Sequence, residues 1–460
     1  MAKELFGTDG IRGIPGEYPL DDQTLYAAGR SLGGYLRHIA TVQAEKPGGT
    51  NGAGPARVLI GMDTRESGPH IAAQMAAGLA AEGAAISSAG IVSTPGVACL
   101  VRREKFSAGV VISASHNPYH DNGVKLFAGS GMKFPDEIEE RLEIEILRGR
   151  KEFAPARAKP LEADRSLDED YLGFLRDCAI PGAQLAGMKI VLDCANGAAS
   201  ALGPALFRSL GATVAPIHNV PDGRNINAHC GALHPEDLQK KVVEERAALG
   251  VAFDGDADRA IFVSASGRVV DGDGVLLVAA RYMREAGKLA GTRIVGTTMA
   301  NLALERLFAA EGLSLARMPV GDRYVLEEMV RSGANLGGEQ SGHIIFLDDA
   351  TTGDGLLTAL KIAGLVSLRG PLDALVSDLK VYPQTIVNVN VRSRPALESL
   401  AHVSRTLDEA TRTLGTAGRV VLRYSGTEPK ARVMVEAERA EDVTYWAERI
   451  ASAVKSEIGV

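Results

Sequence analysis

Four features are scarce in this chain of 460 residues: cysteine, aromatic residues, an excess of one charge and long apolar runs. The four cysteines, Cys99, Cys178, Cys194 and Cys230, are far apart in sequence and form no CxxC pair. This spacing argues against a disulfide framework or a structural zinc site, and it favours free thiols in a reducing compartment.

The charge balance is mildly acidic. Lys and Arg number 50 and Asp and Glu number 57, so the formal net charge is −7. A nucleic-acid partner that binds a broad basic face is therefore not expected, whereas a local positive pocket for a small anionic ligand is compatible with this balance. The apolar share of 45% and the charged share of 23% are typical of a globular protein.

Membrane and export segments are not expected. No apolar run approaches the roughly 20 residues that span a bilayer, and the first residues, MAKELFGTDGIRG, carry no apolar signal core. We therefore expect a cytoplasmic protein with no membrane partner.

Short apolar runs alternate with longer helical stretches along most of the chain. At about 150 residues per domain, the length predicts about three domains, with two to four as the range. The alternation predicts α/β units with largely parallel sheets. Strands are expected at 58–62, 108–113, 189–193, 249–253, 260–263 and 293–296, and helices at 71–82, 195–210 and 301–311.

The C-terminal part has a different pattern, typical of a smaller α+β domain. Strands are expected at 385–391, 420–423 and 432–436 and a helix at 441–457. Pro-containing stretches at 148–165 and 370–384 are candidate linkers, and the Gly-rich stretch 46–55 is interpreted as a flexible surface insertion.

The first segment with candidate catalytic residues is ISASHNP, which begins at the end of the predicted strand 108–113. Ligands of α/β sheets bind at the carboxyl ends of strands, so Ser115 is placed to act as a nucleophile. Neighbouring residues of an extended chain point to opposite sides, which makes His116 a poor direct base for Ser115. Lys125 is a candidate cation for a phosphate near Ser115.

The second segment, DGDADR, follows the predicted strand 249–253. Asp254, Asp256 and Asp258 would share one side of an extended chain. Three close carboxylates repel one another unless a cation neutralises them, and an all-oxygen set suits Mg²⁺.

Two further segments carry polar groups beside glycines. GGEQSGH offers Glu339, Ser341 and His343, a set that suits sugar hydroxyls. RYSGTEP, with Arg432 after it, offers two guanidiniums and hydroxyls for a phosphate.

Together these segments resemble the α-D-phosphohexomutase superfamily, in particular its bacterial branch that acts on glucosamine phosphates. The N-terminal FGTDGIRG, residues 113–127, the stretches PDG and NIN at 221–227, and GDRY at 321–324 agree with it, in the family's order. The likeness extends over essentially the whole chain.

The resemblance implies an α/β fold of four domains around a central cleft, three of them α/β with mixed or parallel sheets and the last a smaller α+β domain. The expected domains are 1–158 with a phosphoserine loop, 159–263 with a metal loop, 264–375 with a sugar-recognition loop and 376–460 with a phosphate-binding loop.

The site residues are carried over from the family's motifs. The resemblance implies a phosphoserine at Ser115 and Mg²⁺ held by Ser115, Asp254, Asp256 and Asp258. The implied catalytic residues are Ser115, His116, Lys125 and His343, with the general acid/base left open between Lys125 and His343. The implied substrate-binding residues are Arg12, Arg259, Glu339, Ser341, His343, Arg423, Ser425, Gly426, Thr427 and Arg432.

The implied activity is reversible movement of a phosphoryl group between O6 and O1 of glucosamine phosphate, with a sugar 1,6-bisphosphate as activator and intermediate. Lys430 is similar to the branch acting on mannose and glucose phosphates, which keeps that substrate class as an alternative. A sugar phosphatase with an aspartate nucleophile and a non-catalytic sugar-phosphate sensor are more distant alternatives. A homodimer and an activating kinase remain open as partners.

Overall fold

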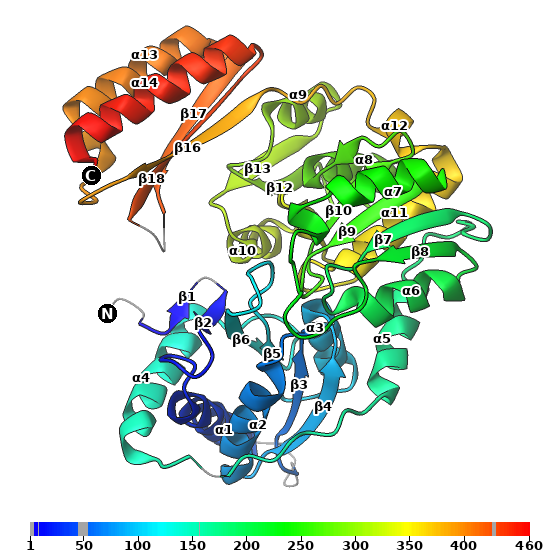
Figure 1. Cartoon of the computed structure of the whole chain (residues 1–460), viewed down its shortest axis with the longest axis vertical. Coiled ribbons are helices and arrows are strands. Elements are labelled where there is room, and N and C mark those ends of the chain that lie inside the picture. Colours follow the sequence, from blue (N-terminus) through cyan, green and yellow to red (C-terminus); the bar gives the residue numbers. More distant parts are fainter. Residues whose placement is uncertain (1–3, 8, 45–53, 156, 426–428) are drawn as a thin grey trace. The chain divides into compact units, whose positions relative to one another are not determined.

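The computed structural model describes residues 4–7, 9–44, 54–155, 157–425 and 429–460 (Figure 1). The chain forms two compact units. One contains Met1–Thr297 and Met318–Val376, and the other contains Thr298–Arg317 and Ser377–Val460. Among the described helices, none is long and apolar enough to cross a membrane.

The first sheet has six strands in the order β1-β2-β6-β5-β3-β4. Their bounds are β1 Phe6–Gly7, β2 Gly10–Gly13, β3 Arg57–Met62, β4 Ala85–Ile91, β5 Ala108–Ile112 and β6 Asn122–Ala128. β3 lies parallel to β4 and β5, and the other pairs are antiparallel. β5 is buried along its whole length. The start of the loop that follows its carboxyl end is therefore held in a fixed position.

Helices α1 (Asp22–Ala44), α2 (Gly68–Ala81), α3 (Thr94–Arg103) and α4 (Asp136–Glu152) accompany this sheet. Two glycines allow α1 and α2 to approach closely. A Cβ on Gly29 would lie 2.2 Å from the Met75 carbonyl oxygen, and one on Gly78 would lie 2.2 Å from that of Tyr26. The close approach buries the apolar faces of both helices in the core of this sheet.

The second sheet has the order β11-β10-β9-β7-β8. The strands are β7 Lys189–Asp193, β8 Thr213–Ile217, β9 Leu249–Phe253, β10 Ala260–Ser264 and β11 Val269–Val270, with α5 (Ser166–Asp177), α6 (Ala199–Ser209), η1 (Gly231–Leu233) and α7 (Glu236–Glu245). β7, β8 and β9 are parallel, whereas β10 pairs antiparallel with both β9 and β11. β7 ends at Asp193, and the carboxyl end of β9 leads into the acidic loop DGDADR.

A third group in the same unit contains β12 (Arg293–Thr297), β14 (Leu336–Gly338) and β15 (Ile344–Phe346), with α8 (Gly272–Glu285), α10 (Asp322–Ser332), α11 (Gly355–Arg369) and α12 (Leu372–Leu375). β12 and β14 are parallel, and β14 and β15 form a hairpin. The hairpin turn is residues 339–343, within the GEQSGH segment.

The second unit contains a three-stranded antiparallel sheet in the order β16-β18-β17. Its elements are α9 (Leu302–Ala310), most of β13 (Ser314–Met318), β16 (Gln384–Asn390), η2 (Leu397–Ser399), α13 (Ala401–Leu414), η3 (Gly415–Ala417), β17 (Gly418–Tyr424), β18 (Lys430–Ala437) and α14 (Ala440–Ile458). Arg419 donates to the carbonyl oxygens of Thr298 at 2.7 Å and Ala300 at 2.6 Å, which ties the 298–317 segment to this sheet.

The structure confirms the α/β class, the mixed sheets and a small C-terminal α+β part, and it corrects several details. The sheets are mixed rather than largely parallel. The helix expected from residue 195 begins at Ala199, because Ala195 and Asn196 have φ angles of 52° and 48°, outside the helical range. The candidate linker at 148–165 begins inside α4, and the one at 370–384 contains α12. Most of the insertion expected at 46–55 lies outside the described residues.

Candidate active site

Ser115 occupies the loop that follows β5 and is only 1% exposed. Its φ of 52° is in the left-handed region. The Ser115 amide donates to the Ser113 hydroxyl at 2.9 Å, and its own hydroxyl donates to Asp254 Oδ2 at 2.7 Å. The loop therefore directs the candidate nucleophile at the carboxylate segment that follows β9.

The expectation that His116 points away from Ser115 is wrong. It assumed an extended chain, but the left-handed turn at Ser115 places His116 Nδ1 3.4 Å from the Ser115 hydroxyl oxygen. The same nitrogen lies 3.2 Å from Arg259 NH1. Burial, then the charges of Arg259 and Arg12, lower the pKa of His116 to about 4.

Asp254, Asp256 and Asp258 form a compact, buried cluster. One oxygen from each lies within 4.8 Å of the others. The chain gathers them by a turn rather than by extension: Ala257 has a φ of 54°, and its amide donates to the Asp254 carbonyl at 3.0 Å. Burial, then Asp258 and Asp256, raise the pKa of Asp254 well above its usual value.

This cluster has the chemistry of a cation site. Asp256 Oδ1 and Asp258 Oδ1 are buried, and neither accepts a hydrogen bond from any residue that the structure describes. A buried carboxylate oxygen without a partner is costly, and a divalent cation with oxygen ligands would satisfy both. The three carboxylates can therefore hold a metal ion beside the Ser115 hydroxyl.

Lys125 is a buried cation at the same place rather than a surface lysine. It is 1% exposed, and its Nζ lies 2.9 Å from Asp256 Oδ2 and 3.0 Å from Asp9 Oδ2. Burial disfavours its charge, but Asp256, Asp9 and Asp258 outweigh that effect and raise the pKa of Lys125 above its usual value. A protonated ammonium beside the carboxylate cluster is suited to neutralising a phosphoryl group.

The ion-pair network continues through residues that the sequence analysis did not select. Lys133 Nζ lies 2.6 Å from Asp9 Oδ1 and 2.7 Å from Asp322 Oδ2. Lys133 and Asp322 also line a cavity of about 400 Å³. Asp9 pairs with Arg12, whose NH1 donates to Asn117 Oδ1 at 3.4 Å, so the FGTDGIRG motif joins the Ser115 loop.

A fully buried arginine, also missed, holds the Ser115 loop in shape. Arg65 NH2 donates to the carbonyl oxygens of Ser115 at 3.0 Å and Asn117 at 2.8 Å, and its NH1 donates to that of Pro118. Arg65 Nε pairs with buried Asp63 at 3.0 Å. The sequence did carry an indication: Asp63 and Arg65 follow β3, the parallel neighbour of β5, at the sheet edge where loops converge.

Asp63 and Asn227 complete this support. Asp63 Oδ2 accepts the Ser113 hydroxyl at 2.6 Å. Asn227, from the NIN stretch, donates through Nδ2 to the carbonyl oxygens of Ser115 at 2.9 Å and Asn117 at 3.1 Å. The backbone of the loop is thus held from β3 and from the second sheet at once.

The GEQSGH turn lies beside the carboxylate cluster. Ala260 donates its amide to the Gly342 carbonyl at 3.1 Å, and His343 Nδ1 lies 3.4 Å from Asp258 Oδ2. His343 Nε2 accepts the Gly353 amide at 2.9 Å, so the ring is fixed against Asp258. Glu339 Oε1 accepts the Gly321 amide at 3.0 Å, and Ser341 Oγ is 3.5 Å from Glu339 Oε2.

Arg259 extends from the carboxylate loop. Its Nε lies 3.8 Å from Asp258 Oδ1. Burial disfavours its charge, yet Asp258, Asp254 and Glu339 raise its pKa above the usual value. Arg259 therefore adds a permanent cation between the Ser115 loop and the GEQSGH turn.

The predicted phosphate-binding residues lie in the second unit. Arg423 of β17 and Arg432 of β18 are directly opposite each other in the antiparallel ladder, and Arg432 NH2 is 3.5 Å from Ser425 Oγ. Burial and the Arg432 charge lower the pKa of Arg423. Like charges opposite each other are destabilising by themselves, and an anion would relieve this. Gly426 and Thr427, and Thr8 of the N-terminal motif, lie outside the described residues.

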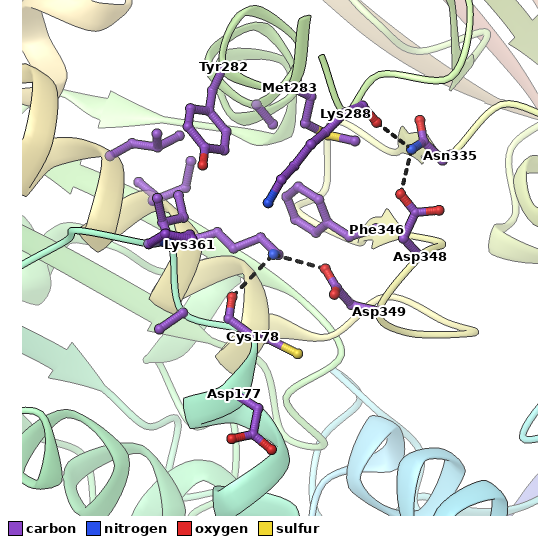
Figure 2. A pocket seen from close by; sticks show the side chains of 16 residues that line it. Asp177, Cys178, Tyr282, Met283, Lys288, Asn335, Phe346, Asp348, Asp349 and Lys361 are labelled. Carbon is purple, nitrogen blue, oxygen red and sulfur yellow. Dashed lines mark hydrogen bonds and ion pairs between the residues drawn. The ribbon is translucent and has the colours of Figure 1, made fainter. Parts of the chain in front are cut away.

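A separate cavity of about 410 Å³ lies between α5, α8 and α11. None of the residues predicted for the site lines it. Figure 2 shows Lys361 directed at Asp349 and at the Cys178 carbonyl, with its Nζ 2.9 Å from Asp349 Oδ2 and 3.3 Å from that carbonyl oxygen. Cavity volume alone would therefore not locate the candidate active site.

The arrangement of serine, carboxylate cluster and buried lysine agrees with what comparison with known proteins finds. Four domain profiles of the phosphoglucomutase/phosphomannomutase family match in order: alpha/beta/alpha domain I at residues 3–152, alpha/beta/alpha domain II at 169–267, alpha/beta/alpha domain III at 271–382 and the C-terminal domain at 386–453. The chain belongs to this family of phosphohexomutases, which are isomerases that act by phosphoryl transfer.

Individual relatives match over the full length. A phosphoglucosamine mutase of Solibacter usitatus is 52% identical, covering 100% of both chains. One of Koribacter versatilis is 47% identical, covering 100% of this chain and 98% of its own. The solved structure of a phosphoglucomutase/phosphomannomutase family protein from Burkholderia thailandensis has the same fold, with a TM-score of 0.78, 23% identity and 100% coverage of both chains.

Proposed function

We propose that this protein is a phosphoglucosamine mutase, which interconverts glucosamine 6-phosphate and glucosamine 1-phosphate. The observation that carries the chemistry is the 2.7 Å hydrogen bond from the Ser115 hydroxyl to Asp254, inside the three-carboxylate cluster. The choice of sugar is supported by the two full-length relatives at 52% and 47% identity, both phosphoglucosamine mutases.

In the proposed reaction, Ser115 carries a phosphoryl group and transfers it to the free hydroxyl of the sugar phosphate. The bond from phosphorus to Ser115 Oγ breaks as the bond to the sugar oxygen forms. The sugar hydroxyl gives its proton to a general base, and the leaving Ser115 Oγ accepts a proton and becomes a hydroxyl. The product is a sugar 1,6-bisphosphate. After this intermediate reorients end for end, Ser115 Oγ takes the phosphoryl group from the other sugar oxygen. The Ser115 hydroxyl gives up its proton as the new bond forms, and the released sugar oxygen accepts a proton.

The surroundings of Ser115 support each requirement of this transfer. Phosphoryl transfer passes through a loose transition state, so positioning and charge neutralisation dominate. Arg65 and Asn227 fix the loop backbone, Lys125 supplies a buried positive charge, and Asp254, Asp256 and Asp258 would hold Mg²⁺. When bound, Mg²⁺ would offset the charge on the transferring group.

The proton carrier is proposed among residues beside the cluster. Lys125 and His343 were the candidates from sequence, and His116 Nδ1 lies 3.4 Å from Ser115 Oγ. His343 Nε2 is already engaged by the Gly353 amide, which suits it to positioning Asp258. Arg12, Arg259, Glu339 and Ser341 are proposed to contact the sugar, and Arg423, Ser425, Gly426, Thr427 and Arg432 to bind the phosphate that does not react.

Three further expectations from the sequence extend this proposal. The division into four domains, with boundaries after residues 158, 263 and 375, and the sugar 1,6-bisphosphate activator follow from the family resemblance. A cytoplasmic location suits the four cysteines, which are all free thiols in the structure.

The sugar preference is the direct test of the proposed function. We expect kcat/KM for glucosamine 6-phosphate to exceed that for mannose 6-phosphate and glucose 6-phosphate by at least about 100-fold, since a site that pairs a polar group rejects analogues lacking it. The measurement is the initial rate with each sugar at saturating Mg²⁺ and a trace of the matching bisphosphate.

Two results would contradict the proposal. A higher kcat/KM for mannose or glucose phosphate would assign the chain to the alternative substrate class. Release of inorganic phosphate without formation of the 1-phosphate isomer would favour the phosphatase.

A second prediction concerns the carboxylate cluster. Asp256 accepts from both Lys125 and Thr94 through Oδ2 and leaves Oδ1 without a partner. Asp256→Asn keeps the shape but removes the charge, so the Mg²⁺ concentration for half-maximal activity should rise at least about 100-fold. Asp170→Asn, an exposed carboxylate on α5 outside the cluster, is the control. An unchanged Mg²⁺ titration for Asp256→Asn would remove Asp256 from the metal site.

A further inference from the structure

A second group of metal-binding side chains lies at the carboxyl ends of β7 and β8, outside the site described above. Asp193, His218 and Cys230 each offer one ligand atom, and these atoms lie within 4.8 Å of one another. They come from the end of β7 and from two later loops, with a separation of 25 residues from Asp193 to His218 and of 12 from His218 to Cys230, and no known motif spacing joins them. The fold alone brings a carboxylate, an imidazole and a thiol to one point.

Two backbone amides hold the Asp193 carboxylate in place. Asp193 ends β7 and is 0% exposed. Its Oδ1 accepts the Ala195 amide at 2.9 Å, and its Oδ2 accepts the Gly231 amide at 2.9 Å. The second of these bonds fixes the turn that begins at Cys230, itself 2% exposed.

His218 presents a nitrogen to the same point. Its Nδ1 is buried and lies 3.1 Å from Asp193 Oδ2, yet it is not aligned for a hydrogen bond with any residue that the structure describes. Its other nitrogen, Nε2, lies 3.7 Å from Asp237 Oδ2. An imidazole with one nitrogen directed at a shared point and the other facing a carboxylate is the usual arrangement of a metal-binding histidine.

We propose that Asp193, His218 and Cys230 form a Zn²⁺ site, distinct from the three-carboxylate cluster. A thiolate and an imidazole suit Zn²⁺ and not Mg²⁺, which prefers oxygen ligands. Bond lengths of about 2.0–2.1 Å place tetrahedral O and N ligands about 3.3 Å apart, close to the 3.1 Å between Asp193 Oδ2 and His218 Nδ1. Three protein ligands leave the fourth position to water.

Ion binding displaces protons from the ligand side chains. Burial, then Asp193 and Asp237, raise the pKa of Cys230 to about 12, so the thiol is protonated when no cation is present. Binding of Zn²⁺ replaces the thiol proton, and that proton leaves to solvent while the bond from zinc to sulfur forms. The imidazole binds in its neutral form, and because Asp193 raises the pKa of His218, a proton held on that ring is released as well.

The site adjoins the loops that support Ser115. Asn227, three residues before Cys230, donates its amide to the Ala195 carbonyl at 2.9 Å and its side chain to the Ser115 carbonyl. Ala198 donates its amide to the carbonyl of Gly255, within the carboxylate loop, at 2.8 Å. A metal on Asp193 and Cys230 would therefore stabilise the backbone on which both the serine loop and the carboxylate loop rest.

The test is equilibrium dialysis of the full chain, freed of metal by a chelator, against ZnCl₂ with a large excess of Mg²⁺ to occupy the carboxylate cluster. We expect one zinc per chain by elemental analysis, and the same stoichiometry in Asp256→Asn. Cys230→Ser and His218→Gln should each weaken zinc binding by about 10–100-fold or more. Co²⁺ in place of Zn²⁺ should give a thiolate charge-transfer band that Cys230→Ser abolishes.

Cys194→Ser is the matched control, because Cys194 is a neighbouring buried thiol outside the three-ligand group. It should keep full zinc affinity. Zinc binding that is absent from the wild type, or unchanged in His218→Gln, overturns the proposal. If Cys230→Ser does not fold, His218→Gln decides alone. Since the readout is bound metal, a different sugar preference would not affect the result.

Discussion

Replacing Ser115 with alanine is expected to reduce turnover by on the order of 10³-fold or more while leaving the fold intact. The change removes the only oxygen that would carry the phosphoryl group and the hydrogen bond to Asp254. The loop backbone keeps its bonds from Arg65 and Asn227. The measurement is the rate of isomerisation, together with intact-protein mass spectrometry for one phosphoryl group on the active wild type.

Ser130→Ala is a suitable control, because Ser130 is an exposed serine in a turn of the same sheet region. It should retain wild-type activity and phosphorylation. Near-normal turnover of Ser115→Ala, or an active wild type that never carries the modification, would remove Ser115 from the mechanism.

The second large effect is expected at Arg65. Arg65→Met leaves the buried Asp63 carboxylate and the carbonyl oxygens of Ser115, Asn117 and Pro118 without the guanidinium that pairs with them. Breaking a buried ion pair from one side costs about 3–5 kcal/mol, and we expect a loss of unfolding free energy of that size. The measurement is denaturant unfolding.

Arg65 is a positioning residue, because it contacts the loop that bears Ser115 and not the reacting atoms. In Arg65→Met at a temperature where it is folded, we expect kcat to fall by about 10–100-fold with little change in KM. The control Arg224→Met breaks an exposed pair with Glu66 and should leave the free energy of unfolding nearly unchanged, because solvent screens exposed ion pairs. A kcat equal to that of the wild type in folded Arg65→Met would contradict the positioning role.

The sequence identified the segments that carry the candidate catalytic residues, but it did not reveal the contacts that bring these segments together. Ser115 and Asp254 are 139 residues apart, and each was identified because it follows an apolar strand. Their contact depends on how two sheets face each other, which a local pattern does not encode. The same holds for Lys125, whose burial between Asp256 and Asp9 only the folded chain reveals.

Local backbone geometry was the main source of error. Extended loops were assumed at Ser115 and at Asp254–Asp258, but positive φ angles at Ser115 and Ala257 turn both loops. Non-glycine residues rarely adopt such angles, so propensity gave no indication of them. These turns bring His116 beside the Ser115 hydroxyl and gather the three carboxylates.

The sequence by itself determined the α/β class, the order of the chemical segments and the phosphohexomutase family, because apolar periodicity and short motifs are local properties of a chain. Only the tertiary structure decided which side chains share a site: the Arg65 support of the serine loop, the buried Lys125, and the meeting of Asp193, His218 and Cys230. Those contacts join residues distant in sequence, and close packing of complete sheets and helices sets their distances.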